Sequence, residues 1–428
     1  GTDLFNAAKL KYNRKIEWAS CADNMPVTGW EVVRNVKSMA AAIEFGTSKI
    51  VTVVGEGNGE GPAQLLGFGV VPYDGYSDAH WNASDEDVDQ AILKSVREAE
   101  LSSGREIKEI YVGVPGDFIH LEQNEVTLEL DGERRITPED VDDVMNLALD
   151  YKNKQDGVII HRSPAWFTVD DRRTMEPAGL KGSVVKCMAS FVIADATFLE
   201  DMQARMEEQD IHINGYLSPA LGEALLLIPP EERDKVAVLV DVGYLSTEVM
   251  FVQGDALIRH EVLPMGGGHL AADLAMELSI TMDMAEELKR KYTFGIGQDQ
   301  LSVTDPDGQN VSFPRETVLA VIEPRVAELS DMVRDTIEKY ASELSQRSTF
   351  YITGGGLILM RGGRETISSV VERTFKAPTP PAIKLNSPVY SSAIGLLELV
   401  YESVSQMEVK PSESTSKIGS FFKAFFTK

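Results

Sequence analysis

Two segments of the chain place a carboxylate, a glycine and hydroxyl side chains in the same order at the end of an apolar run. Residues 42–48 read AIEFGTS, and residues 239–246, about half the chain further on, read LVDVGYLS. Each segment predicts a strand–turn–strand hairpin, with Gly46 or Gly243 at the turn. Because glycine lets backbone N–H groups approach an anion closely, both hairpins are suited to bind phosphate. Further donors are the hydroxyls of Thr47, Ser48, Ser246 and Thr247 and the ammonium group of Lys49.

The carboxylates of the two segments, Glu44 and Asp241, indicate a phosphate bridged by a metal ion. A carboxylate repels bare phosphate but suits a hydrated Mg²⁺ ion, so both side chains are expected to hold Mg²⁺ through water. One hairpin of this kind is usually an ordinary turn. Two in tandem, with a later apolar run that ends in Gly354, Gly355 and Gly356, favour a nucleotide cleft between two similar domains.

Other nucleotide and metal motifs are missing from the sequence. It contains no Gly-x4-Gly-Lys-Ser/Thr loop, and the glycines at 55–61 lead into another expected strand, so they are no dinucleotide fingerprint. The six histidines include no pair at metal-ligand spacing, and no metal site built from protein ligands alone is expected.

Composition narrows the class of protein. A chain of 428 residues has room for two to four domains. The net charge of −26 argues against nucleic acid, whose phosphates need a basic surface. Two cysteines are too few for a disulfide framework, and no apolar stretch approaches the roughly 20 residues of a membrane span.

The elements that would position these residues alternate between strands and helices. Strands are expected within 40–54 and at 107–115, 126–130, 236–242, 248–253, 257–263 and 350–353. Helices are expected at 85–101, 137–152, 269–278, 281–292 and 316–345. Strands that end in glycine and alternate with helices are typical of α/β architecture.

The last twelve residues, 417–428, form a separate segment after the short polar stretch 411–416. Five large apolar side chains recur at helical spacing and share one face, namely Ile418, Phe421, Phe422, Phe425 and Phe426. Lysines at 417, 423 and 428 add positive charge that the acidic body lacks. The pattern predicts an amphipathic helix that lies on a membrane, and the alternative is a terminal helix docked on the protein itself.

Several of these segments carry a resemblance to a known family. Residues 43–50 resemble the first phosphate motif of the actin superfamily in the form found in the bacterial FtsA family, and residues 241–248 resemble the second. Residues 285–289 are similar to the helix that holds the ribose, which implies roles for Glu286 and Lys289. Residues 352–356 resemble the adenosine motif, while 164–179 and 263–269 are similar to the FtsA family in particular.

The resemblance implies an actin-like (ribonuclease-H-like duplicated) ATPase fold, with two lobes around a nucleotide cleft and an inserted subdomain. On this basis residues 1–38 are an extension of unknown role, and 39–112, 186–220 and 365–405 form subdomain 1A. The insertion, 1C, is expected at 113–185, subdomain 2A at 221–265 and 346–364, and 2B at 266–345. A linker (406–416) and the membrane-targeting helix (417–428) follow.

The function that the resemblance implies is a role in cell division. Such a protein binds ATP and Mg²⁺, polymerises on the cytoplasmic face of the membrane at the division site and recruits the tubulin-like FtsZ. The FtsZ contact is expected near Arg325 and Glu328. Two alternatives stay open: a PilM-like pilus-assembly protein, and a small-molecule kinase of the same superfamily, which has no use for a lipid-binding tail.

The sequence departs from the family pattern at the phosphate motifs. Glu44 stands where the family usually has Asp, and Tyr244, Leu245 and Glu248 stand where it has two glycines and a final Asp. Backbone N–H groups can still reach a phosphate past bulky side chains, but the attacking water is easily misplaced. The sequence therefore predicts nucleotide binding with at most slow hydrolysis.

Overall fold

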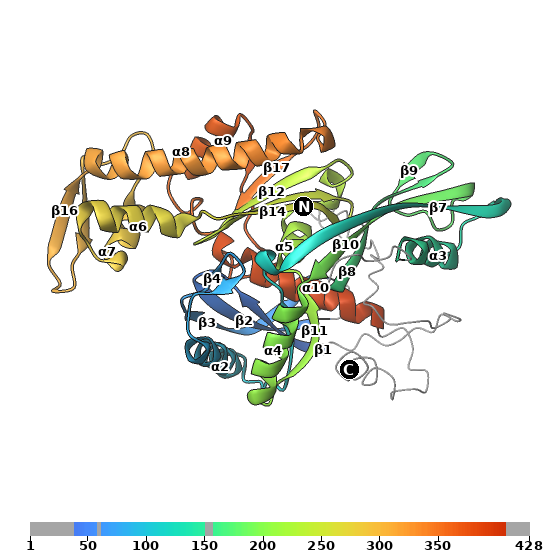
Figure 1. Ribbon diagram of the computed structural model, residues 1–428, viewed down its shortest axis with the longest axis horizontal. Coiled ribbons are helices and arrows are strands. Elements are labelled where there is room, and N and C mark those ends of the chain that lie inside the picture. The colour runs from blue at the N-terminus through green and yellow to red at the C-terminus, as the bar shows by residue number, and fades with distance from the viewer. Residues whose placement is uncertain (1–37, 58–60, 150–156, 408–428) are drawn as a thin grey trace, which may run out of the picture.

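The computed structural model of the protein describes residues 38–57, 61–149 and 157–407. Two α/β lobes lie one above the other with two helices between them, and a third, elongated sheet extends to one side (Figure 1). Residues 1–37 of the predicted extension (1–38), residues 408–416 of the predicted linker (406–416) and the whole predicted terminal helix (417–428) lie outside the described residues. In the described part of the chain, no helix is long and apolar enough to span a membrane.

The first lobe is built on a five-stranded sheet in the order β11-β6-β1-β2-β3. Its strands are β1 (Ser38–Phe45), β2 (Lys49–Gly57), β3 (Gln64–Pro72), β6 (Glu109–Gly113) and β11 (His212–Leu217). Helices α2 (Asp85–Ser103) and α4 (Ala196–Glu208) bury their apolar faces against the outer side of this sheet. A small hairpin of β4 (Tyr76–Ser77) and β5 (His80–Trp81) completes the lobe.

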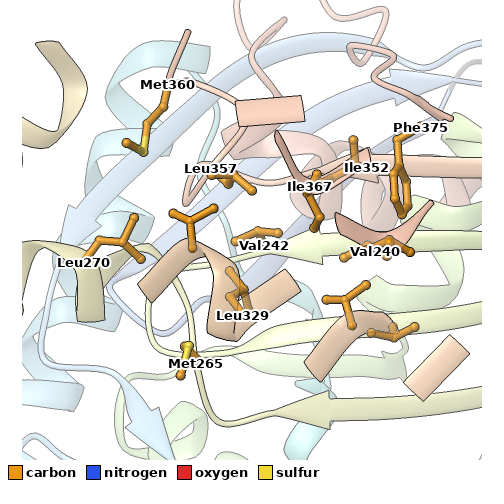
Figure 2. Close-up of a cluster of buried hydrophobic side chains, with 14 of the residues drawn as sticks. Val240, Val242, Met265, Leu270, Leu329, Ile352, Leu357, Met360, Ile367 and Phe375 are labelled. Carbon is orange, nitrogen blue, oxygen red and sulfur yellow. The ribbon is translucent and has the colours of Figure 1, made fainter. Parts of the chain in front are cut away.

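The second lobe repeats the plan with the sheet order β14-β13-β12-β17-β18. Its strands are β12 (Ala237–Val242), β13 (Thr247–Gln253), β14 (Ala256–Leu263), β17 (Phe350–Thr353) and β18 (Phe375–Lys376). The helices of this lobe are α6 (Gly267–Leu278), α7 (Met282–Lys291), α8 (Arg315–Lys339) and α9 (Gly363–Val371). Valines of β12 pack with Leu329 of α8 and Ile367 of α9 in one buried core (Figure 2). A hairpin of β15 (Gln300–Thr304) and β16 (Asn310–Pro314) lies at the end of this lobe (Figure 1).

Two helices fill the space between the sheets: α5 (Pro219–Leu227) and α10 (Ser391–Met407). Their apolar side chains share a core with inward-facing residues of β1, β2, β12 and β13. The helices meet at Gly222 and Gly395, where a Cβ on either residue would come within 3.0 Å of the other helix's backbone, closer than real Cβ atoms come. The helix backbones are therefore in direct contact, and the lobes are joined by one continuous core.

The third sheet is an insertion into the first lobe. Its order is β7-β10-β8-β9, from β7 (Ile119–Arg135), β8 (Val158–Val169), β9 (Arg172–Thr174) and β10 (Lys181–Ala194), with α3 (Pro138–Leu149) packed on it. The 3₁₀ turn η1 (Gly116–Phe118) leads into it. Although the chain enters from the first lobe, Gln123 and Ser190 donate to the backbone carbonyls of Ile258 and Leu257 on β14 of the second lobe.

Several predicted bounds differ from the structure. The expected short strand 126–130 is the centre of the 17-residue β7, and the helix expected at 316–345 ends at Lys339, before the 3₁₀ turn η3 (Ala341–Glu343). The expected end of the insertion at 185 falls inside β10, and α10 extends to Met407, past the start of the expected linker. Residues 365–375 carry Ile367, Val371 and Phe375 into the second-lobe core, not into the first lobe.

The helix crossing predicts the effect of adding one methyl group. Gly395→Ala should lower the free energy of unfolding by about 1–3 kcal/mol, because the new Cβ forces α10 away from the α5 backbone. Gly215→Ala on β11 is the matched control, since its Cβ would lie 3.5 Å from the Tyr111 ring, an ordinary contact. Chemical denaturation measures both variants, and an equal loss of stability in the two would contradict the constraint at the crossing.

Candidate functional site

The two sequence-predicted hairpins, β1–β2 and β12–β13, have the same turn. Gly46 N–H donates to the Lys49 carbonyl at 2.9 Å, and Gly243 N–H donates to the Ser246 carbonyl at 3.0 Å. Both hairpins are antiparallel and in matching register up to the turn. Glu44 and Asp241 therefore occupy equivalent positions, two residues before the glycine of each turn.

The two turns face each other across the lobes. The amide of Leu245 in the second turn donates to the hydroxyl of Thr47 in the first, at 3.0 Å. Within the described residues, the amides of Thr47, Ser48 and Tyr244 donate to no backbone or side-chain acceptor. Unpaired N–H groups at adjacent turns are an arrangement that binds anions.

Two tyrosines, which the sequence analysis did not predict, hold the first turn in place. Tyr73 donates its hydroxyl to the Gly46 carbonyl at 2.8 Å, and Tyr76 donates to the Phe45 carbonyl at 3.2 Å. Tyr73 N–H also donates to the Ser48 carbonyl at 3.1 Å. These three bonds anchor the first turn to the lobe through its carbonyl groups. The turn-forming segment 72–76 (PYDGY) is the only sequence signal for this brace.

The paired carboxylates are held in an environment that disfavours their charge. Burial raises the pKa of Glu44 to about 7, against the opposing effects of Lys49 and of a hydrogen bond with Ser392. Burial also raises the pKa of Asp241 to about 7, and the charges of Glu248 and Glu44 add to the shift. Asp241 Oδ1 is buried without a hydrogen-bond partner. A cation would relieve both the repulsion and the unmet acceptor.

More acidic groups surround this pair than the sequence indicated. Glu248 contacts His260 Nε2 at 2.7 Å, and burial followed by the charge of Glu248 raises the pKa of Asp117 to about 6. Glu223 of α5 is only 2% exposed. Among the described residues, no three His, Cys, Asp or Glu side chains are placed to hold a metal ion directly. The arrangement thus fits a cation that keeps its water ligands.

The second turn is supported by the glycines that the sequence singled out. Gly356 N–H donates to the Val242 carbonyl at 2.8 Å, and Gly267 N–H, at the start of α6, donates to the Gly243 carbonyl at 2.9 Å. Gly354 has φ +88°, and a Cβ there would collide with the Asp241 carboxylate. Glycine at these positions lets the turn, the N-terminus of α6 and the loop after β17 meet.

The candidate hydroxyl donors have different roles. Thr47 accepts the Leu245 amide, and Thr247 is buried and donates to the Met265 carbonyl at 2.7 Å. Ser246 contributes its carbonyl to the turn. Lys49 lies with its ammonium 5.8 Å from the centroid of the Tyr390 ring. Thr247 is therefore a structural support for the approach to α6, and the structure does not direct it at a ligand.

The two candidate ribose residues lie on one face of α7 and contact each other. Lys289, 3% exposed, donates to Glu286 at 2.7 Å and to the Gly267 carbonyl at 2.9 Å. Its ammonium also lies 5.9 Å from the centroid of the Tyr244 ring, which rests against Gly268. The pair thus ties α7 to the N-terminus of α6 beside the second turn.

The candidate partner residues, Arg325 and Glu328, form a separate group on α8. Arg325 donates to both carboxylate oxygens of Asp273 on α6, at 2.6 and 3.1 Å, and to Glu328 at 2.8 Å. These bonds connect α8 with α6 and leave Glu328 more than half exposed.

Two family profiles match the chain. One described as "Cell division protein FtsA" covers residues 238–395, which hold the second turn, the ribose candidates and the Gly354–Gly356 loop. One described as "SHS2 domain inserted in FTSA" covers residues 116–193, from η1 to the end of β10. The second match coincides with the four-stranded insertion.

Relatives with curated names match along most of their length. Cell division protein FtsA of Escherichia coli (strain K12) is 24% identical, over 90% of this chain and 96% of that protein. The protein of the same name from Bacillus subtilis (strain 168) is 23% identical to this chain, over 85% of this chain and 84% of that protein.

Solved structures resemble the chain in fold. The PilM–PilN type IV pilus biogenesis complex contains a chain with 18% identity and a TM-score of 0.58, matched over 88% of this chain and all of that one. MreB5 of Spiroplasma citri bound to ADP has 12% identity and a TM-score of 0.50, over 86% and 98%. These likenesses confirm the predicted actin-like fold. With both profiles and the named relatives, the chain belongs to the family of the cell division protein FtsA.

Proposed function

We propose that this chain binds Mg²⁺–ATP between its two lobes and acts in cell division as a membrane-attached, self-assembling protein that recruits FtsZ. The observation that carries the nucleotide site is the pair of matching turns, which face each other with one carboxylate at the same position in each. Membership of the FtsA family supports the role in division.

The residues of the cleft fit the parts of the nucleotide. Free amides at Thr47, Ser48 and Tyr244 suit the phosphates, and Lys49 adds charge. Glu44 and Asp241 suit the water shell of Mg²⁺, which would neutralise the phosphates when bound. The remaining contacts assigned to the nucleotide come from Gly46, Gly243, Ser246, Glu286, Lys289, Gly354, Gly355 and Gly356.

Hydrolysis is proposed to be slow at most. Tyr244 packs its ring on Gly268, and the neighbouring Leu245 amide is engaged by Thr47. The Tyr244 ring fills space that a glycine would leave open. Catalysis of phosphoryl transfer depends almost entirely on positioning, which includes the attacking water, and on electrostatic stabilisation.

The nucleotide site gives the first test. Isothermal titration calorimetry should show Mg²⁺–ATP binding to the parent chain, and Asp241→Asn should weaken it at least tenfold, about 1.4 kcal/mol. The matched control is Glu398→Gln on α10, whose carboxylate accepts the Ala63 amide and does not face the turns. No binding to the parent at millimolar nucleotide and Mg²⁺ would refute the nucleotide site.

The turnover prediction is separate. The parent should hydrolyse ATP far below the enzyme median of about 10 s⁻¹. Tyr244→Gly combined with Leu245→Gly should raise the rate, because the second turn then has space for water beside the phosphates. A phosphate-release assay measures both proteins; a parent rate near the median would show that these side chains do not limit catalysis.

Attachment to lipid is proposed to depend on residues 417–428. Replacing Phe422 and Phe425 with Glu should abolish co-sedimentation with anionic liposomes, because charge would have to enter the acyl boundary. ATP binding should be unchanged in this variant. Undiminished pelleting would rule the segment out as the anchor, whereas loss of folding or of ATP binding would favour a helix docked on the body.

A further inference from the structure

One edge of the inserted sheet has no strand beside it. The order β7-β10-β8-β9 places the long strand β7 at an edge, and in the described part of the chain no strand pairs with its outer side. From Glu125 to Asp131 the side chains of β7 alternate between exposed and partly buried. The regular edge ends at Gly132, whose φ is +78°. A long exposed edge is a template for the addition of a further strand, and folded proteins usually cover or blunt such edges.

The two faces of this edge differ in chemistry. One face is apolar and joins the core beside α3 through Val126, Leu128 and Leu130. The other face is exposed and acidic, with Glu125, Glu129 and Asp131. Two neighbouring cations on β7 and β10 are engaged with other groups, Arg134 with Asp140 and Lys186 with Asp171. A strand that adds to this edge should therefore be apolar on one face and basic on the other.

The sequence contains a segment with this pattern, within the predicted extension 1–38. Residues 9–15 read KLKYNRK, so that Leu10 and Tyr12 alternate with polar and basic residues. Alternation with a period of two is typical of a strand. The segment carries four positive charges, although the net charge of the chain is −26.

We propose that residues 9–15 pair with the outer edge of β7 in the same chain, as an antiparallel strand with Lys15 opposite Glu125. Lys11 then lies opposite Glu129, and Lys9 lies opposite Asp131. The other pairs in this register are Asn13 with Thr127, Tyr12 with Leu128, Leu10 with Leu130, and Arg14 with Val126. Opposite charges that face each other across a ladder stabilise it, and the apolar pairs extend the core beside α3.

The register follows from the positions of the lysines. A shift by one residue turns all three lysines to the apolar face, because successive side chains of a strand point to opposite faces. A shift by two residues in either direction places at least one lysine opposite an uncharged residue, and a parallel arrangement pairs at most two lysines with carboxylates. The antiparallel register with Lys15 opposite Glu125 is therefore the one that pairs all three.

The chain between the two strands is long enough for this pairing. The structure leads from Ser38 along β1 to Ala42, across the pairing of Ala42 with Tyr111, and along the chain to Glu125. At about 3.5 Å per residue and about 4.8 Å between strands, this route limits the separation of Ser38 and Glu125 to about 68 Å. The chain from Lys15 to Ser38 can extend to about 80 Å.

The test is hydrogen exchange of the full chain, followed by mass spectrometry. In the parent, amides of residues 9–15 and of residues 125–131 should be protected. Lys11→Glu combined with Lys15→Glu should speed exchange in both segments at least tenfold, because like charges then face each other. The matched control is Arg34→Glu combined with Lys37→Glu, which reverses two charges of the same extension outside the segment and should leave both rates unchanged.

A charge exchange between the strands tests the register. Adding Glu125→Lys and Glu129→Lys to the Lys11→Glu, Lys15→Glu variant should restore protection, since both ion pairs form again with reversed signs. Rapid exchange of residues 9–15 in the parent, or an equal loss of protection in the control, would overturn the proposal. Protection that increases with protein concentration would also contradict it, by assigning the added strand to a second copy of the chain. The pairing does not involve the nucleotide site, so ATP affinity should be the same in all these variants.

Discussion

The contact between the backbones of α5 and α10 at Gly222 and Gly395 is the constraint on which the arrangement of the molecule depends. It lets two helices form a layer thin enough for both sheets to pack on it as a single core. The distance between the lobes then allows Leu245 of one turn to donate to Thr47 of the other. A side chain at the crossing would widen that layer and separate the turns. Helix α10 also carries Ser392, whose side chain hydrogen-bonds Glu44 of the first turn.

The burial of Glu44 and Asp241 at the two turns costs stability when no cation is present. The pKa values of Glu44 and Asp241 rise from 4.5 and 3.8 to about 7 in the folded chain. Because the folded state holds these protons more tightly, stability falls as pH rises from about 4 to about 7. At neutral pH these two carboxyl groups therefore favour a ligand that brings positive charge. Carboxyl groups with shifted pKa values cluster at functional sites.

Local patterns in the sequence predicted the two hairpins well, because an apolar run ended by glycine determines both the strand and its turn. The groups that complete the site come from elsewhere in the chain. Tyr73 and Ser392 reach the first turn only through packing. The lobe to which α9 belongs could not be predicted either, since Ile367 and Val371 show that the helix is amphipathic but not which sheet covers it.

The length of β7 was underestimated for a related reason. Most of its 17 residues are polar or charged and partly exposed, and only the stretch around 126–130 shows apolar alternation. Its extension is fixed by pairing with β10 along almost the whole strand. Long-range pairing of this kind leaves little trace in the local sequence.

The inserted sheet is connected along the chain to the first lobe, but its hydrogen bonds to β14 attach it to the second lobe. It leaves the first lobe near η1 and returns to it at Asp195, the N-cap of α4, yet Gln123 and Ser190 attach it to the backbone of β14. Any rotation of one lobe against the other must therefore either break these bonds or bend the chain at its two exits (Figure 1). Since Glu248 lies against Gly116 at the first exit, that bend would begin beside the acidic residues near the two turns. The outer end of the long sheet would then move farther than the residues at the exits, because displacement in a rotation grows with distance from the axis.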